Sequence, residues 1–243
     1  MNATLRIPPD PQQNHLLAAL PDADRARWLA LLDPVELRLG QVLYASGSTP
    51  SHVYFPTSAI VSLMYLAQDG ASAEFAVVGN DGVVGISLFM GGNATPSQAV
   101  VQSAGQACRL PASLVRHEVQ RGGAVLALLL RYTQSLIAQV AQTAACNRYH
   151  SIDQRLSRRL LLGLDRTPVG ELAMTQELAA SLLGVRREGV TAAALKLQSA
   201  GVIRYNRGHI AVLDRHQLEQ HACECYKVAK KEFARLLPMP CAA

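Results

Sequence analysis

The stretch from Ala124 to Tyr149 constrains the fold of this 243-residue chain more than any other, because it contains neither proline nor glycine. It is rich in Leu, Ala and Gln, which favour an α-helix. At 1.5 Å per residue such a helix is roughly 40 Å long. The chain must therefore arrange its other elements around one long rod near its middle.

The apolar residues of this predicted helix recur at alternating steps of four and three, as in the a/d seam of a coiled coil. This spacing predicts a parallel dimer, in which polar Thr133 and Asn147 would fix the register. Leu129 and Leu136 lie beside the seam and would pack on the helix's own domain. The alternative is a single amphipathic helix lying along that domain. The predicted dimer contacts are Leu126, Leu130, Thr133, Ile137, Val140, Ala144 and Asn147.

Before the helix, the hydrophobic pattern has a period of two and is interrupted by glycines. Many short strands with glycine turns indicate a compact β-barrel or β-sandwich, and Asp69-Gly70 is a hairpin signal. The expected strands are Glu36–Leu39, Gln41–Tyr44, His52–Phe55, Ala59–Leu66, Glu74–Val78, and segments near Gln98–Gln102 and Gln106–Leu110.

The remaining segments complete the expected domain organisation. Residues 1–20 are rich in proline and polar groups and are expected to form a loose arm, with a short helix at Asp22–Leu32. We expect a barrel over residues 21–122, the long helix over 123–150 and a third unit over 151–243. Ser151 to Gln154 is a capping-box pattern, which predicts that the helical run breaks and restarts there.

The third unit contains a predicted helix-turn-helix between Thr175 and Ala200. Thr175 can cap a first helix, Gly184 suits a tight turn, and Arg186, Arg187 and Glu188 open a second helix. An ordinary helical hairpin is the alternative for this stretch alone.

Around this motif, further elements are expected. A helix over Gln154–Leu164 should place Leu156, Leu160 and Leu161 inside and Arg155, Arg158 and Arg159 outside. Val202–Tyr205 and His209–Leu213, joined by a turn at Gly208, predict a β-hairpin, and so a winged helix-turn-helix. A single helix with a basic face is expected over Gln217–Leu237.

The net charge of +5 is unevenly distributed. Residues 1–150 contain nine basic and nine acidic residues, whereas residues 151–243 contain fourteen and nine. Positive charge concentrated in the unit with the helix-turn-helix is the electrostatic signature expected for binding a phosphate backbone.

A glycine-punctuated barrel, a long helix, a hinge and a winged helix-turn-helix, in this order, resemble the Crp/Fnr family of bacterial transcription regulators. The resemblance is carried by Gly40-Gln41-Val42-Leu43-Tyr44 with Gly47, Gly85 to Phe89, the Thr175 to Thr191 segment and Gly201-Val202-Ile203. It implies an α+β fold with a double-stranded β-helix or jelly-roll-like sensor barrel. It also implies a homodimer that binds a two-fold symmetric operator and relays a sensory state of the barrel through the long helix.

The resemblance places a ligand pocket near Gly85, Ile86, Ser87 and Ser97. Members that bind cyclic nucleotides have a Gly-Glu pair for the ribose and an Arg-Ser or Arg-Thr pair for the phosphate. Here Ile86 follows Gly85, and Pro96-Ser97 stands near the second position, which disfavours a cyclic nucleotide. The first cysteine is Cys108, which disfavours an N-terminal iron–sulfur cluster, and no haem axial pair can be chosen. The effector stays unidentified, and no cofactor is expected.

In the second helix of the motif, Arg187 and Glu188 match the family's base-reading pair. Arginine can bond guanine O6 and N7, and glutamate can accept from cytosine N4. A second family arginine is replaced by Ala192, so the operator sequence cannot be copied from other members. The expected DNA contacts are Thr175, Gln176, Arg186, Arg187, Glu188, Thr191 and Arg207.

Five cysteines without a disulfide pattern are typical of a reducing compartment. His221, Cys223 and Cys225 alternate on an expected helix, where 223 points away from the other two, so buried helix cysteines are favoured over a metal site. Cys108 and Cys146 are expected in a core or an interface. No catalytic motif is recognisable, so we do not expect an enzyme.

The leading hypothesis is a dimeric transcription regulator that binds double-stranded DNA in the cytoplasm, without a membrane segment, and that contacts RNA polymerase and an unidentified small molecule. The alternative is a ligand-binding sensor that acts through protein partners.

Overall fold

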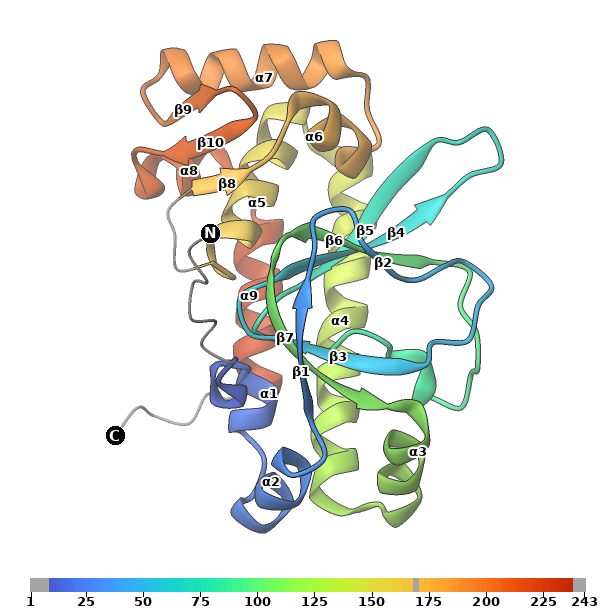
Figure 1. The fold of residues 1–243 in the computed structure, drawn as a ribbon. Coiled ribbons are helices and arrows are strands. Elements are labelled where there is room, and N and C mark those ends of the chain that lie inside the picture. Colours follow the sequence, from blue (N-terminus) through green and yellow to red (C-terminus); the bar gives the residue numbers. More distant parts are fainter. Residues whose placement is uncertain (1–8, 168–170, 238–243) are drawn as a thin grey trace, which may run out of the picture.

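The computed structural model describes residues 9–167 and 171–237 (Figure 1). An N-terminal barrel and a C-terminal helical lobe flank a long central helix. The α+β fold class, with a β-rich domain, a long helix and a helix-turn-helix, is confirmed.

The barrel consists of two antiparallel sheets that face each other. Hydrophobic residues at alternate positions fill the space between them, including Leu37, Phe55, Leu63 and Val101. Asp69-Gly70 lies in the turn of the hairpin formed by β4 (Ile60–Leu66) and β5 (Ser72–Val78), as expected. One sheet has the order β1 (Asp33–Leu37), β7 (Gly105–Pro111), β3 (His52–Pro56); the other has the order β2 (Val42–Tyr44), β6 (Gln98–Ser103), β4 (Ile60–Leu66), β5 (Ser72–Val78).

The expectation of a loose arm is wrong for the residues just before the barrel. A 3-10 turn (Pro11–Gln13) leads into α1 (His15–Ala18) and α2 (Asp22–Leu29). The fully buried Asn14 donates to the carbonyl oxygens of Pro56 and Gly82 at 2.9 and 2.8 Å. Leu16 and Leu17 enter the barrel core. Residues 1–8 lie outside the described part of the chain.

After α3 (Ala112–Arg121), α4 (Gly123–Tyr149) forms the 27-residue helix that the sequence predicts. One of its faces covers the barrel with Val125, Leu129, Tyr132 and Leu136. By length and composition this helix could cross a membrane. Its apolar content is explained at least as well by this contact with the barrel, since such helices also occur in the cores of soluble proteins.

The predicted dimer seam on α4 needs one correction. Thr133 is only 4% exposed and donates to the carbonyl oxygen of Leu129, so it faces its own protomer and cannot reach a partner. Val140 is half-buried and packs against the barrel core. The helix turns the side that contains Thr133 and Val140 towards the barrel. Compared with the predicted seam, every second position of the exposed apolar stripe is therefore shifted by one residue. This stripe contains Ala127, Leu130, Ile137, Ala141 and Ala144, with the polar Gln134 between Leu130 and Ile137.

The C-terminal lobe begins with α5 (Ile152–Leu164), capped by Ser151 and Gln154 in the predicted capping box. A three-stranded sheet follows, with the order β8 (Glu171–Ala173), β10 (His209–Val212), β9 (Ile203–Asn206). Between β8 and β9 lie α6 (Gln176–Leu183) and α7 (Arg187–Ser199). Leu156, Leu160, Val190, Leu197 and Ile210 belong to the core of this lobe.

The chain ends differently from the expectation of one helix over Gln217–Leu237. Two helices form, α8 (Arg215–His221) and α9 (Cys225–Leu236), with a break between them. α9 packs along α4 and brings Phe233, Leu236 and Leu237 to the barrel core. The break is needed because α8 packs on α5 whereas α9 follows α4.

The prediction that Arg155, Arg158 and Arg159 face outwards is also wrong, since all three are at most 9% exposed. The three side chains are covered by different elements: Arg155 donates to Leu183 O of α6, Arg158 donates to Thr143 of α4, and Arg159 reaches the barrel. Arg159 forms an ion pair with Glu74 of β5, with Nε 2.5 Å from Oε1. Glu74 and Arg159 also share hydrogen bonds with Ser62 and Gln102 in the barrel. The C-terminal lobe is therefore fastened to the barrel through a buried polar network.

Candidate nucleic-acid interface

The helix-turn-helix is built by α6 and α7 with a three-residue connection. The hydroxyl oxygen of Thr175 accepts from the backbone N–H of Leu178 at 3.0 Å and caps α6. Gly184 ends α6 with a φ of 62°, in the left-handed region that favours glycine. Val185 N then donates to Ala180 O at 3.0 Å, and the chain turns into α7. Packing of Leu182 and Val190 in the lobe core fixes the two helices against each other.

The first turn of α7 presents three exposed charged side chains, those of Arg186, Arg187 and Glu188. Within the described residues, no side-chain hydrogen bond or ion pair engages any of the three. They also stand at a helix N-terminus, where unpaired backbone N–H groups favour an anion such as phosphate. This turn can therefore offer a guanidinium fork, a carboxylate acceptor and a positive helix end to a ligand.

Gln176 and Thr191 connect the N-terminal ends of the two helices. The Thr191 hydroxyl lies 2.9 Å from Oε1 of Gln176 and 3.0 Å from the carbonyl oxygen of Arg187. The hydroxyl is thus engaged inside the motif. Both residues belong to the same surface as Arg187.

Tyr205 of β9 joins this surface, although sequence reasoning did not select it. Burial raises the pKa of its hydroxyl, and a hydrogen bond from the backbone amide of Gln176 partly offsets that effect. The sequence signal for this role of Tyr205 is an aromatic residue directly before the Asn206–His209 pair that closes the wing turn. Tyr205 holds the wing against the beginning of α6.

The wing is the β9–β10 hairpin, in which Asn206 pairs with His209 across a two-residue turn. Arg207 and Gly208 both have positive φ, at 47° and 83°, as a type I′ turn requires. The carbonyl oxygen of Gly208 accepts from Met174 N at 2.7 Å, and its Cα packs beside Thr175. The wing tip with exposed Arg207 therefore lies next to the N-terminus of α6.

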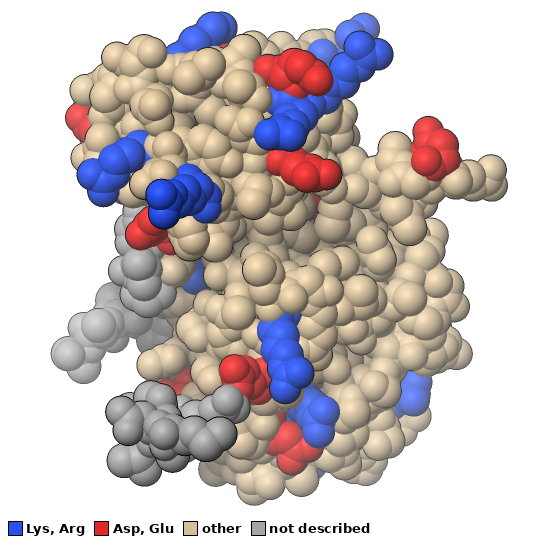
Figure 2. Space-filling model, turned by 45° about the horizontal axis from the view of Figure 1, so that its top comes forward, with Lys and Arg blue, Asp and Glu red and all other residues tan. Residues whose placement is uncertain are grey.

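The charge on this lobe is less one-sided than its sequence indicates. Four of the fourteen basic residues, Arg155, Arg158, Arg159 and Arg166, are buried. Ten basic and nine acidic residues then remain in residues 151–243. Figure 2 accordingly shows separate basic groups interspersed with acidic ones over the upper lobe. DNA attraction would depend on the local group at α7 and the wing more than on net charge.

The four residues predicted to line a ligand pocket lie in the barrel. In the described structure, no contact brings all four of them together. Gly85 has a φ of 102° and precedes a 3-10 turn (Ile86–Leu88). Ser97 is buried, with its hydroxyl 2.9 Å from that of Thr95. The hydroxyl of Ser87 is buried and has no hydrogen-bond partner among the described residues.

A cavity of about 440 Å³ lies elsewhere, between the barrel and the C-terminal lobe. It is bordered by α4, α5 and α9 and includes the charged groups of Asp81, Asp165, Arg166 and Lys230. The barrel pocket thus stays a prediction, while a concave, partly charged space exists at the interface of the lobes.

Family comparisons match both lobes. Residues 34–121 match the cyclic nucleotide-binding domain, and residues 154–221 match the Crp-like helix-turn-helix domain. No curated protein matches the sequence significantly.

Several solved structures have the same fold, and this chain aligns with nearly the whole length of each of them. FixK2 from Bradyrhizobium japonicum has a TM-score of 0.69 at 18% identity, covering 79% of this chain and 98% of its own. The global regulator CLP of Xanthomonas campestris has a TM-score of 0.64 at 15% identity, covering 80% and 100%. A CRP/FNR-family transcriptional regulator from Thermus thermophilus has a TM-score of 0.64 at 22% identity, covering 78% and 98%.

A cyclic nucleotide-binding-like barrel followed by a winged helix-turn-helix defines a transcription regulator with a DNA-binding domain. Within that class, the chain belongs to the Crp/Fnr family.

Proposed function

We propose that this regulator reads its operator with the first turn of α7 and anchors the wing on the adjacent backbone. The observation that carries this proposal is that Arg187 and Glu188 are exposed at a helix N-terminus and that their side chains have no partner among residues 9–167 and 171–237. Arg187 would bond a guanine and Glu188 a cytosine. Arg186 and Arg207 would contact phosphates, while Thr175, Gln176 and Thr191 would hold the two helices in register at the groove.

The regulator acts as a homodimer in this proposal, with the exposed stripe of α4 as the contact. Leu130 and Ile137 are 50% and 58% exposed, and they recur with Ala127, Gln134, Ala141 and Ala144 at a/d spacing. A second copy of the same helix is the occupant favoured by this self-complementary stripe. Two recognition helices related by a two-fold axis would then require a roughly palindromic operator. Ala144 and Asn147 are retained from the sequence prediction as contacts at the end of the stripe.

The signal would reach α7 through the buried contacts between the lobes. Glu74–Arg159 and Asp81–Arg166 both connect a barrel residue to α5 or its end. A ligand that moved either barrel carboxylate would change the orientation of the helix-turn-helix. An effector near Gly85, Ile86, Ser87 and Ser97, a contact with RNA polymerase and a cytoplasmic location complete the proposal.

Selection of bound fragments from genomic DNA tests the proposal directly. Full-length protein is incubated with sheared genomic DNA, with and without small-molecule cell extract, and bound fragments are sequenced. An enriched, two-fold symmetric motif is the expected result. A random fragment pool under both conditions would instead favour the alternative, a sensor that acts through protein partners.

A further inference from the structure

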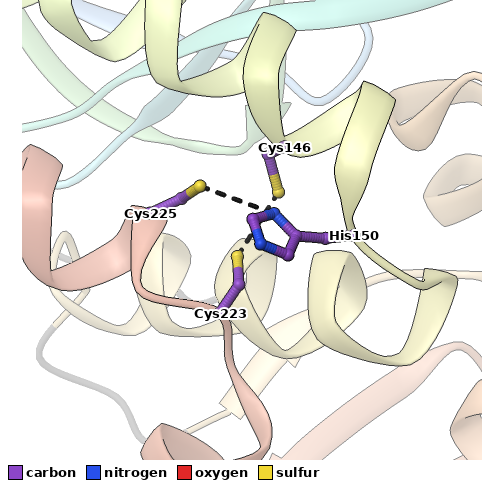
Figure 3. A group of neighbouring side chains, drawn as sticks. All are labelled: Cys146, His150, Cys223 and Cys225. Atoms are coloured by element: carbon purple, nitrogen blue, oxygen red, sulfur yellow. Dashed lines mark hydrogen bonds between the residues drawn. The ribbon is translucent and has the colours of Figure 1, made fainter.

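A cluster of three cysteines and one histidine lies where α4 ends, apart from the helix-turn-helix and the barrel. Cys146 is in the last turn of α4, and His150 is its C-terminal cap residue. Cys223 and Cys225 lie at the break between α8 and α9. All four side chains point towards one another (Figure 3). The break in the C-terminal helix brings both of these cysteines to the same side.

The ligand atoms of the cluster lie close enough together to bind one ion, and two of their separations are near those of a tetrahedral site. The three sulfur atoms and a ring nitrogen all lie within 4.8 Å of one another. Sγ of Cys146 and Cys223 are 3.5 Å apart, and Sγ of Cys225 is 3.6 Å from Nδ1 of His150. Tetrahedral zinc with bonds of about 2.3 Å to sulfur and 2.0–2.1 Å to nitrogen places S···S at about 3.8 Å and S···N at about 3.6 Å. A disulfide would need a sulfur–sulfur separation of about 2.05 Å, much shorter than the one between Cys146 and Cys223.

The histidine ring is held as metal-bound histidines are usually held. Its Nδ1 lies 3.6 Å from Sγ of Cys225, while Nε2 lies 3.2 Å from Oε1 of Glu224. A carboxylate that accepts from the second ring nitrogen fixes the tautomer that leaves the first nitrogen free to bind a metal. Glu224 is exposed and sits between the two cysteines of the α8–α9 break, so one short segment supplies two ligands and the group that orients a third.

The surroundings also supply charge that such an ion would need. Zinc with three thiolates carries one net negative charge. Arg155 and Arg158 are buried beside the cluster, and their positive charges act on the sulfur of Cys146. Among the described residues neither contacts a carboxylate: Arg155 donates to Leu183 O, and Arg158 donates to Thr143 Oγ1 at 3.0 Å. Nε of both guanidinium groups has no hydrogen-bond partner in the part of the chain that the structure describes. Buried cations without an anionic partner are costly, so an anionic metal centre would stabilise both.

We propose that Cys146, His150, Cys223 and Cys225 form a structural zinc site that joins the end of α4 to the beginning of α9. Binding converts the three thiols to thiolates and releases their protons to solvent, so that affinity rises with pH. Four protein ligands leave no open position, which is the pattern of a structural ion rather than a catalytic one. The ion fixes the C-terminal helix at the hinge between α4 and α5.

The proposal is tested on full-length protein, purified under reducing conditions and analysed by elemental mass spectrometry. One zinc ion per chain is expected, and Cys223→Ser and His150→Ala should lower the zinc retained after chelator treatment at least tenfold. Two matched variants should retain it: Cys108→Ser, a buried cysteine in the barrel, and His221→Ala, an exposed histidine near the cluster. Equal retention in all four variants would overturn the proposal.

Cobalt(II) in place of zinc provides a measurement that does not require a destabilising variant. The wild-type protein should show sulfur-to-cobalt charge transfer and the intense ligand-field bands of tetrahedral cobalt. His150→Cys, which keeps four ligands, should retain both with a shifted ligand-field spectrum. Weak octahedral bands, or a Cys146–Cys223 disulfide in freshly purified protein that excludes metal, would refute the site. Neither assay involves DNA, so its outcome is independent of the proposed operator binding.

Discussion

The guanidinium group of Arg166, just beyond α5, makes an ion pair with the carboxylate of Asp81 in the barrel, with contacts of 2.5 and 3.0 Å. Arg166 is 6% exposed and Asp81 is 16% exposed on their side chains, so this pair is largely excluded from water. It connects the two lobes beside the cavity, and its loss has consequences that can be measured.

Asp81→Asn should lower the free energy of unfolding by about 3 kcal/mol, because a buried guanidinium group would lose its charged partner. The matched control is Asp33→Asn, which removes the carboxylate of a pair with Arg109 at 3.7 Å whose side chains are 58% and 39% exposed. That change should cost less than about 1 kcal/mol. Denaturant unfolding of both variants makes the comparison, and similar losses would show that the Asp81 contact is not buried in solution.

Arg187→Ala should weaken binding to the selected operator by about 1–3 kcal/mol while random DNA is bound almost as before, because base readout is lost and phosphate contacts persist. Fluorescence anisotropy with both DNAs measures the difference. Arg235→Ala, on the exposed face of α9, is the control and should alter neither affinity. An equal loss on both DNAs with Arg187→Ala would indicate a phosphate contact instead.

Arg207→Asn should remove one wing charge without damaging the wing. Asparagine tolerates the left-handed conformation that Arg207 adopts at φ 47°, and Asn-Gly is the preferred type I′ turn. The melting temperature should therefore stay the same or rise. The slope of log affinity against log salt should fall by about 1. An unchanged slope would mean that Arg207 does not contact phosphate.

Ile137→Glu should convert a dimer into a monomer, because it places a charge in the middle of the exposed stripe of α4. Light scattering at micromolar concentration distinguishes the two masses. Leu39→Glu is the control, since Leu39 is 62% exposed in the barrel and lies outside the stripe. A wild-type protein with the mass of one chain would contradict the proposed assembly.

The ion pair of Glu118 should make the thermal stability of the protein depend on pH. Hydrogen bonds from Arg27 hold its pKa below the ordinary value of 4.5, with a further contribution from Trp28. A lowered pKa stabilises the fold at pH values above 4.5, and this contribution disappears as the pH falls through the lowered pKa. Glu118→Gln should therefore lower the melting temperature by a few degrees at pH 7, and this difference should shrink as the pH falls below 4.5. Thermal unfolding across this range checks it, and a constant difference would argue against an ionised Glu118.

The elements that could be predicted from the sequence are those specified by local chemistry. The capping box at Ser151, the turn at Gly184, the hairpin at Gly208 and the proline-free run of α4 each depend on residues close in sequence. Their combination was specific enough to indicate the family, which the two domain matches confirm.

The predictions that the structure corrects concern residues at contacts between elements far apart in the sequence. Arg159 has the pattern of a solvated helix residue, and only its contact with Glu74, 85 positions earlier, makes burial favourable. Thr133 occupied a plausible seam position, but the rotation of α4 is set by the barrel and α9. The four-residue cysteine–histidine cluster was missed for the same reason. Cys223 and Cys225 were placed on one continuous helix, whereas Cys146, which lies 77 positions before Cys223, comes from the end of α4.

The position of α9 also determines when the barrel can complete its core during synthesis. Leu236 and Leu237 share the barrel core with Leu16 and Leu17, near the other end of the chain. When a ribosome has translated the strands of the barrel, it has not yet synthesised α9, which closes this core. The barrel therefore keeps apolar surface exposed until α9 emerges, and a fusion or truncation that disturbs α9 would impair the barrel, although the change lies far from the barrel strands in the sequence.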